Sequence, residues 1–341
     1  MFEVQLSAVD VEEANFVVAD LARRHASVEG EGFQRDAAIA MHELPRTLRE
    51  GLTGFRLEEP DGVCLVSGYE IDDVAIGPTP EHWRHSKNRR QTLPLEIFFY
   101  LSASLLGDPI AWATQQDGYV MHDILPIREH AHEQMGSGSA ELLTWHTEDA
   151  FHPLRTDYIG LMCLRNPDAV ETTYAVADDL EIDPSVRDWL SQTLYPIRPD
   201  RSHLPQNSSG GPIDPALQPL LKRSYAWITQ LDDAPEPIAV MFGDPAQPYL
   251  RLDPYFMPEP ANTEAAGALG VLCSAIDEAL RAYALRPGEV LFVDNYRAVH
   301  GRNSFQARFD GTDRWLKRLN VARDLRRSRA ARLGPAARVI Y

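Results

Sequence analysis

Two histidines, a glutamate and an aspartate lie within the segment WHTEDAFH, from 145 to 152. If this segment is a β-strand, alternate side chains share a face, so His146 and Glu148 point the same way, about 6.6 Å apart along the strand. Thr147 and Asp149 then point to the other face, which favours a structural role for Asp149. An imidazole and a carboxylate that point to one place provide two protein ligands for a metal ion.

The segment LFVDNYRAVHGRNSF provides a third candidate ligand, His300, just past an apolar run that is typical of a buried strand. Two imidazoles and one carboxylate on one face of a metal, with the opposite positions open, form the facial triad of non-heme Fe(II) oxygenases. The same ligand types also suit a zinc-dependent hydrolase. A non-catalytic jelly-roll metal-binding protein is a third interpretation. His152 precedes Pro153 and is expected to begin a loop, so it is not counted as a ligand.

Two arginines that follow His300 favour the oxygenase. Arg314 lies fourteen residues after His300, in GTDRWLKRLN, and Arg318 follows four residues later. A buried guanidinium needs an anionic partner, and its planar fork matches a carboxylate. A dicarboxylate such as 2-oxoglutarate can chelate iron at one end and reach such an arginine with the other. A zinc-dependent hydrolase has no need of these two arginines.

The motifs HTE at 146–148 and VDNYRAVHGR around His300, together with Arg314, resemble the clavaminate synthase-like Fe(II)/2-oxoglutarate-dependent oxygenases. More narrowly, WHTEDAFHP and FVDNYRAVHGR resemble the branch that hydroxylates the β-carbon of free amino acids, including the arginine and enduracididine β-hydroxylases. The resemblance extends from about Val63 to about Arg329. It implies a distorted double-stranded β-helix, that is, a jelly-roll core with added helices.

The resemblance implies how iron and the cosubstrates bind. The two histidines and Glu148 would hold Fe(II), and Arg314 would hold the distal carboxylate of 2-oxoglutarate, with O2 as the other cosubstrate. A threonine in ETTY assists that carboxylate in this family, and we expect Thr173 rather than Thr172. A glutamate ligand favours hydroxylation, because related halogenases lack the carboxylate.

The resemblance also implies contacts to the substrate. Arg318 stands where the family binds the substrate carboxylate. Gln115 in ATQQDGY, with Gln116 as the fallback, would meet the α-amino group, and Glu148 is expected to contact the substrate as well as the metal. A serine before the HTE segment also belongs to the site in this family, and the sequence leaves two choices open: Ser137 and Ser139.

Asp253 in RLDPYFM is expected to pair with a cationic guanidine on the substrate. Arginine β-hydroxylases resemble one another in having acidic residues at this position and two residues later, where this sequence has Tyr255. One carboxylate beside an aromatic ring suits a cyclic guanidine, and an aromatic face attracts a cation by about 0.5 to 2 kcal/mol. We therefore expect β-hydroxylation of free L-enduracididine in non-ribosomal peptide antibiotic biosynthesis, with L-arginine as the alternative substrate.

The hydrophobic pattern predicts the elements that position these residues. Apolar residues recur at helical spacing over 11–25, 93–107 and 264–285, whereas the pattern predicts strands over 62–71, 142–148, 158–164, 172–177 and 289–295. We expect an α+β fold with one domain over residues 1–341. It would have a helical N-terminal part to about residue 110 and a jelly-roll core from about 111 to 325.

Two further segments stand out in composition. The stretch SHLPQNSSGGPIDP, from 202 to 215, is rich in proline, glycine, serine and asparagine, and we expect a loop that covers the site as a lid. The basic run RDLRRSRAARLGPAAR near the C-terminus predicts a solvated terminal helix.

The overall charge restricts the partners of the chain. Lysine and arginine number 33 against 50 aspartates and glutamates, a formal net charge of −17, which argues against nucleic-acid and anionic-membrane partners and permits a cationic ligand. The three cysteines lie in apolar runs, which predicts buried thiols in a reducing compartment. With no signal-peptide pattern and no apolar run of membrane-spanning length, we expect a cytoplasmic protein. Its oligomeric state is not predicted.

Overall fold

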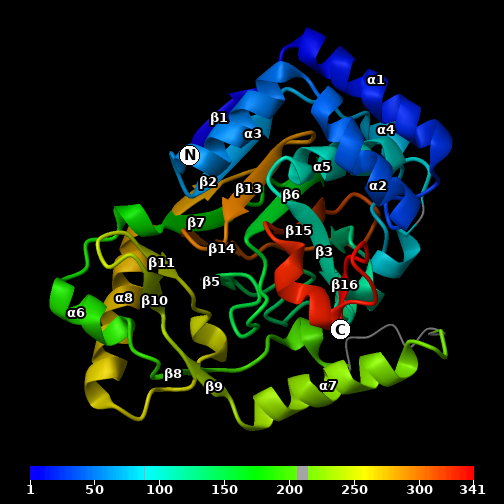
Figure 1. The fold of residues 1–341 in the computed structure, drawn as a ribbon. Helices are drawn as coiled ribbons and strands as arrows, with labels where there is room; N and C mark the ends of the chain where they lie inside the picture. The colour runs from blue at the N-terminus through cyan, green and yellow to red at the C-terminus, as the bar shows by residue number, and fades with distance from the viewer. Residues whose placement is uncertain (88, 206–213) are drawn as a thin grey trace.

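The computed structural model describes residues 1–87, 89–205 and 214–341. Two large sheets are the main feature of these residues (Figure 1). The larger sheet has eight described strands, in the order β1 (Phe2–Gln5), β2 (Val63–Ser67), β13 (Val290–Asp294), β6 (Tyr158–Arg165), β15 (Trp315–Ala322), β3 (Asp108–Trp112) and β16 (Val339–Ile340), with β4 (His122–Ile124) also paired to β15. The smaller sheet has the order β12 (Arg281–Tyr283), β7 (Thr172–Val176), β14 (Ala298–Arg302) and β5 (Leu143–His146).

Helices cover both ends of this arrangement. In Figure 1 the N-terminal helices lie on the side of the larger sheet, and two of the remaining helices lie near the smaller sheet, whereas the helix Gln218–Asp233 lies below the C-terminus. The first group is α1 (Ala8–Arg24), α2 (Glu31–Ala40), α3 (Arg46–Glu58), α4 (Asp73–Ile76) and α5 (Leu93–Ser104). The second group is α6 (Pro184–Leu190), α7 (Gln218–Asp233) and α8 (Thr263–Ala279), with two-stranded sheets formed by β8 (Tyr195–Ile197) with β9 (Glu236–Ile238) and β10 (Met241–Gly243) with β11 (Pro248–Leu250). Helices combined with mainly antiparallel strands agree with the predicted α+β class.

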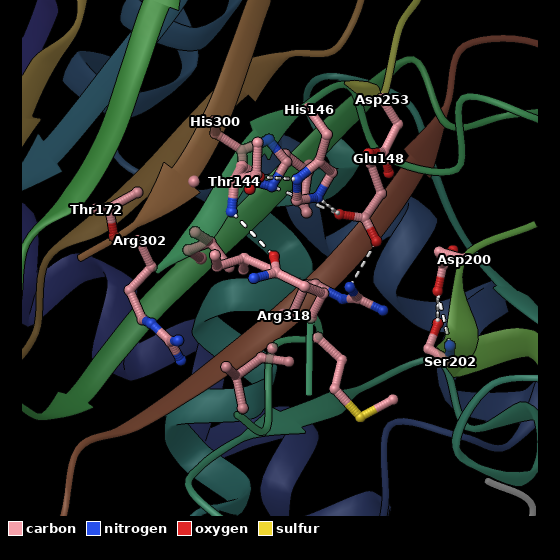
Figure 2. Close-up of a pocket in the computed structure, with 18 of the residues that line it drawn as sticks. Thr144, His146, Glu148, Thr172, Asp200, Ser202, Asp253, His300, Arg302 and Arg318 are labelled. Atoms are coloured by element: carbon pink, nitrogen blue, oxygen red, sulfur yellow. Dashed lines mark hydrogen bonds and ion pairs between the residues drawn. The ribbon is translucent and has the colours of Figure 1, made fainter. Parts of the chain in front are cut away.

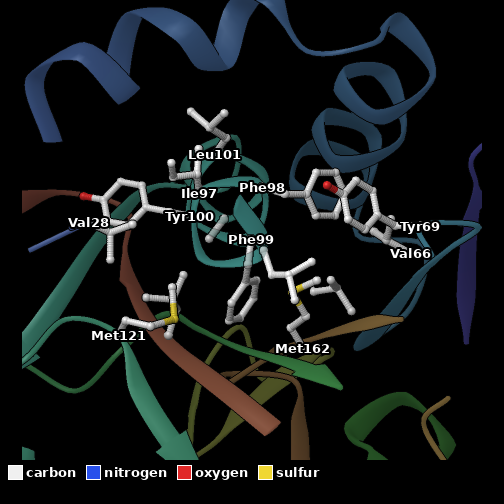
Figure 3. Close-up of a cluster of buried hydrophobic side chains, with 14 of the residues drawn as sticks. Val28, Val66, Tyr69, Ile97, Phe98, Phe99, Tyr100, Leu101, Met121 and Met162 are labelled. Carbon is white, nitrogen blue, oxygen red and sulfur yellow. The ribbon is translucent and has the colours of Figure 1, made fainter. Parts of the chain in front are cut away.

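Helix α5 forms the centre of the core on the outer face of the larger sheet (Figure 3). Phe98 stacks on Tyr69 with ring centroids 3.9 Å apart, and Phe99 contacts the sheet at Gly160. A Cβ at Gly160 would lie 2.8 Å from the Phe99 ring, so only glycine permits this close approach. The all-apolar sequence of 93–107 therefore predicts a buried helix correctly.

Strand β6 shows how the two sheets pack together. Met162 and Leu164 join the helical core, whereas Ile159, Leu161 and Cys163 point to the opposite face. That face packs against residues of the smaller sheet, and this inner cluster includes Tyr174, Val176 and Ala298. The alternation expected of strands thus places the smaller sheet opposite the larger one.

Several predicted boundaries are wrong. The strand predicted over 62–71 is present as β2, which joins β13 of the core, but β1, which the pattern did not predict, pairs with it in parallel. The helix expected over 264–285 ends at Ala279, since β12 pairs with β7. The basic C-terminal run forms a short 3₁₀ helix, Leu325–Ala331, instead of a solvated α-helix, and the buried Arg332 donates to the carbonyl of Leu325.

Within the described ranges, no helix combines the length and the apolar character that crossing a membrane requires.

Candidate active site

The three predicted metal ligands lie together at one end of the space between the two sheets (Figure 2). His146 ends β5 and His300 lies opposite it on β14, in direct register. The Oε2 atom of Glu148 lies 3.9 Å from Nε2 of His146 and 3.5 Å from Nε2 of His300. One ligand atom from each residue lies within 4.8 Å of the others. Two imidazoles and a carboxylate therefore converge on one point.

Backbone contacts fix the position of Glu148, which lies beyond the regular part of β5. The side chain of Asn295 accepts a hydrogen bond from the Glu148 N–H at 2.6 Å and donates one to the Glu148 carbonyl at 3.0 Å. Asn295 also donates to the carbonyl of Thr156 at 2.9 Å. The sequence alone does not single out Asn295, whose only signal is a position just past the apolar run of β13, where a buried amide needs partners.

Gly301 permits the two histidines to pair. A Cβ at this position would lie 2.6 Å from the Leu143 carbonyl oxygen and 2.9 Å from Oγ1 of Thr173, so a side chain does not fit between the flanking strands. The order His-Gly-Arg in the sequence thus reflects the close approach of β14 to β5 and β7.

The surroundings of these residues stabilise a positive charge, so that a metal ion can displace the second proton of the His146 ring. His146 donates from Nδ1 to the Thr144 carbonyl at 2.8 Å, which directs Nε2 to the shared point. Burial lowers the pKa of His146, but Glu148 and Asp253 outweigh it and raise this pKa to about 9. Burial opposes ionisation of Glu148, yet Arg318 and the two histidines hold its pKa well below the usual range. The anionic carboxylate between two imidazoles fits a divalent metal such as Fe(II).

A buried arginine pair lies on one side of the metal ligands. Arg314 and Arg302 both line the pocket, and burial lowers the pKa of Arg314 to about 10. Within the described residues no acidic side chain forms an ion pair with Arg314, and its Nε has no hydrogen-bond partner. Its Nη2 donates to Oγ1 of Thr172 at 3.4 Å. This end of the pocket is therefore built to receive an anion.

The preference for Thr173 over Thr172 is wrong. In the pairing of β7 with β14, Thr172 lies opposite Arg302 and Thr173 lies opposite Gly301. Neighbouring residues on a strand point to opposite faces, so only Thr172 points into the pocket, where it contacts Arg314.

Arg318 lies in the middle of the pocket, on the same face of the larger sheet as Arg314 and Leu316. Its Nη1 donates to Oε1 of Glu148 at 2.5 Å, and its Nη2 donates to Oε1 of Gln115 at 3.2 Å. The fallback residue Gln116 points elsewhere, because its amide bonds with the backbone of Asp123. Of the two expected glutamines, Gln115 is thus the one that contacts Arg318, and it lines the smaller pocket beside that arginine.

Asp253 and Tyr255 lie on the side of the pocket away from Thr172 and Arg302, as Figure 2 shows for Asp253. The Leu252 carbonyl accepts a hydrogen bond from the Thr147 N–H at 2.9 Å, which ties this segment to the HTE motif. Asp253 is 9% exposed, and burial raises its pKa to about 6. Asp253 precedes a 3₁₀ helix, and the backbone N–H groups of Tyr255 and Phe256 partly offset the effect of burial on its pKa, although the side chain makes no full capping hydrogen bond there. Its carboxylate is therefore available to a ligand.

The remaining expected residues fall in different places. Ser137 lines a smaller pocket beside Arg318 and bonds to His130, whereas Ser139 is buried and lines neither pocket. Asp149 does not point away from the site, because its backbone is left-handed, with a φ of 51°, and its side chain reaches the pocket. There it accepts hydrogen bonds from Trp112 and from His203, the latter at 2.8 Å.

Only part of the expected lid can be described, because residues 206–213 lie outside the described ranges. Ser202 and Asp200 line the pocket, and Gln115 donates to Oγ of Ser202 at 2.6 Å. His203 is fully buried and bonds to Asp149 and Thr114. The start of the segment is therefore anchored beside the site, and the closing movement stays a prediction.

Comparison with known proteins gives one family. The model described as "Taurine catabolism dioxygenase TauD, TfdA family" matches residues 239–320. The chain is 49% identical to enduracididine beta-hydroxylase of Streptomyces hygroscopicus over the full length of both proteins. It is 46% identical to the L-ornithine/L-arginine 3-hydroxylase of Catenulispora acidiphila, again over the full length of both.

A solved structure also matches over the whole chain. The non-heme iron oxygenase OrfP, in complex with Fe, succinate and (3S)-hydroxy-L-Arg, superimposes with a TM-score of 0.93 at 40% sequence identity. The match covers 100% of each chain.

Proposed function

This chain belongs to the clavaminate synthase-like group of TauD/TfdA-type Fe(II)/2-oxoglutarate-dependent oxygenases, and on that premise we propose that it hydroxylates the β-carbon of a free basic L-amino acid. L-Enduracididine is the preferred substrate in this proposal, as a step of non-ribosomal peptide antibiotic biosynthesis. L-Arginine is the alternative substrate.

One observation carries the proposal: the pocket has cations at one end, an anion at the other, and the metal ligands between them. The unpaired Arg314 suits the distal carboxylate of 2-oxoglutarate, with Thr172 beside it. The buried Asp253 suits a guanidine on the substrate. A zinc-dependent hydrolase or a metal-binding protein without catalysis would have no use for these two separated charges.

The choice between the two guanidines rests on Asp253 and Tyr255. Asp253 and the ring of Tyr255, which is 48% exposed, offer an ion pair and a flat surface, which suits a cyclic guanidine. Asp200 is a second carboxylate on the wall of this pocket, and it accepts hydrogen bonds from Ser202. The relative at 49% identity is named for enduracididine, and the relative at 46% is named for ornithine and arginine. The OrfP complex holds a hydroxylated arginine, which keeps arginine as the second candidate.

Iron with 2-oxoglutarate and O2 supplies the oxidation, in which one oxygen atom enters the product as hydroxyl and the other enters succinate, with release of CO2. The residues of this chain supply the geometry. Asp253 would hold the guanidine, while Arg318 and Gln115 would hold the carboxylate and the amine of the amino acid. Fixing both ends of the substrate places its Cβ beside the metal ligands and excludes water from the space between.

Two facing sheets support a finer description of the fold. We take them as the two halves of a distorted jelly roll, with α6, α7 and α8 added beside the smaller half. The two buried free thiols, Cys64 and Cys163, support a reducing, cytoplasmic location for the enzyme.

The test is incubation of the protein with Fe(II), 2-oxoglutarate and O2 and a panel of L-enduracididine, L-arginine, L-ornithine, L-lysine and L-asparagine. Mass spectrometry should show a gain of one oxygen on the guanidino amino acids with equimolar succinate, and NMR should place the hydroxyl on Cβ. The Glu148→Ala variant is the control and should lose both products. Oxygen gain on asparagine alone, or hydrolysis with zinc and no succinate, would contradict the proposal.

A further inference from the structure

Arg318 is held by three acceptors that come from separate parts of the chain. Besides Glu148 and Gln115, its Nη2 donates to Nδ1 of His122 at 2.8 Å. A guanidinium has no lone pair to offer, so Nδ1 of His122 must be the acceptor and the ring must carry its proton on Nε2. Burial and the charge of Arg318 hold the pKa of His122 well below its usual value, so the ring is neutral.

His122 contacts the pocket only through Arg318. It is 2% exposed and does not line the pocket itself. On β4 it lies directly opposite Arg318 of β15. The next pair along these strands, Asp123 and Lys317, points to the other face and forms a buried ion pair of 2.6 Å. This ion pair fixes the short strand β4 to β15 and thereby fixes the His122 ring against Arg318.

The three contacts of Arg318 differ in what happens to them when ligands bind. Glu148 is a metal ligand, and Gln115 is expected to meet the amine of the substrate, so both acquire a second partner. His122 has no other partner to serve, since its Nε2 forms no hydrogen bond within the described residues. An arginine has five N–H donors, of which these contacts use three, and Nε of Arg318 has no partner in the described part of the chain.

We propose that His122 is a positioning residue, which holds Nη2 of Arg318 so that the remaining N–H donors face the carboxylate of the amino-acid substrate. The inference rests on the proposed function, because it takes Arg318 as the group that binds this carboxylate. A purely structural role for His122 makes the opposite prediction about an apolar replacement. Leucine removes a buried Nε2–H without a partner, which a structural role would tolerate or favour.

Three variants separate the two roles. His122→Leu fills the space without an acceptor. His122→Asn keeps an acceptor oxygen at about the distance of Nδ1 from the backbone, and His122→Gln places the acceptor farther out. Each protein is loaded anaerobically with Fe(II) and 2-oxoglutarate, and the amino acid that the wild type hydroxylates is titrated by calorimetry. The affinity for 2-oxoglutarate is measured in the same way.

His122→Leu should weaken amino-acid binding about ten- to hundred-fold, the range of one hydrogen bond to a charged group, and leave 2-oxoglutarate binding unchanged. His122→Asn should restore most of the affinity, and His122→Gln should not. Combined with Arg318→Met, His122→Leu should add no further loss, because it acts through that arginine. If His122→Leu fails to fold, the contrast between the asparagine and glutamine variants gives the same answer.

Wild-type affinity in His122→Leu or His122→Gln, equal loss for both ligands, or an additional loss in the double variant would overturn the inference. The proposed function fails separately, if the wild-type protein hydroxylates no basic amino acid. An Arg318→Met variant that binds the amino acid normally would overturn the inference and the role of Arg318 together.

Discussion

Replacing Asp253 with asparagine should weaken substrate binding without lowering the stability of the fold. The carboxylate is buried and lines the pocket, and the backbone N–H groups of Tyr255 and Phe256 that interact with it can also donate to the amide oxygen of asparagine. In the complex, the guanidine of the substrate would lose its counter-charge. Breaking one side of such a buried pair costs about 3 to 5 kcal/mol, which corresponds to about two to four orders of magnitude in affinity.

The same substitution should stabilise the metal-free protein at neutral pH. Burial raises the pKa of Asp253 from 3.8 to about 6, so the folded state binds this proton more tightly than the unfolded chain. Stability is therefore lost as the pH rises through the window from about 4 to 6. At about 1.4 kcal/mol for each pKa unit, the ionised carboxylate costs up to about 3 kcal/mol above pH 6, and asparagine removes that cost.

The assay compares melting temperatures of the metal-free wild type and Asp253→Asn at pH 5 and pH 8, together with kcat/KM for L-enduracididine or L-arginine. The melting temperature of the variant should exceed that of the wild type, and this difference should be larger at pH 8 than at pH 5. Binding of 2-oxoglutarate should not change. Exposed Asp188 supplies the control substitution for the loss of one negative charge. A lower melting temperature with unchanged kcat/KM would refute the reasoning, because it would make Asp253 a capping residue.

Three other outcomes follow from the site. His300→Ala should lose Fe(II) binding in an equilibrium dialysis measurement, and retained binding would contradict the three-ligand site. Arg314→Met should raise the KM for 2-oxoglutarate about ten- to hundred-fold and affect the amino acid much less; Thr172→Val should act in the same direction, whereas the matched Thr173→Val should not. Asn295→Leu leaves the backbone groups of the metal-ligand loop without partners, which should cost about 1 to 3 kcal/mol in urea unfolding and weaken Fe(II) binding in the folded protein; normal Fe(II) affinity would show that the loop holds its own position.

The residues closest to the metal could be placed from the sequence because their signals are local. His146 and Glu148 are only two positions apart. The apolar run that precedes His300 locates a buried strand, and this predicts the position of the histidine in the fold. Arg314 and Arg318 are four positions apart at the start of a strand, a spacing that puts both on one face. For these residues the two-residue period of a β-strand was enough to predict which side chains share a face, even though β5 ends before Glu148.

The residues that the sequence did not reveal depend on contacts between distant segments. Asn295 bonds to a residue 147 positions away, and His122 to one 196 positions away, and neither contact leaves a pattern in either segment. The choice between Thr172 and Thr173 depends on the register of β7 against β14, and a shift of one residue exchanges the two faces. The end of α8 at Ala279 likewise depends on pairing with β7, because the apolar pattern of the helix continues past it.

The net charge of the chain opposes the binding of the ligand at one end of the pocket and favours the binding of the ligand at the other end. A net charge of −17 attracts a cationic amino acid toward the protein and repels the 2-oxoglutarate dianion. The anion end must therefore overcome an unfavourable field. It does so with Arg314 and with the charge of the neighbouring Arg302, whose guanidinium donates to backbone carbonyls; both are buried where salt screens them little. Because Arg314 has no carboxylate partner in the described structure, its full charge is available to a bound dicarboxylate. At the cation end Asp253 and Asp200 both line the pocket, and the field of the protein already favours a cationic ligand there.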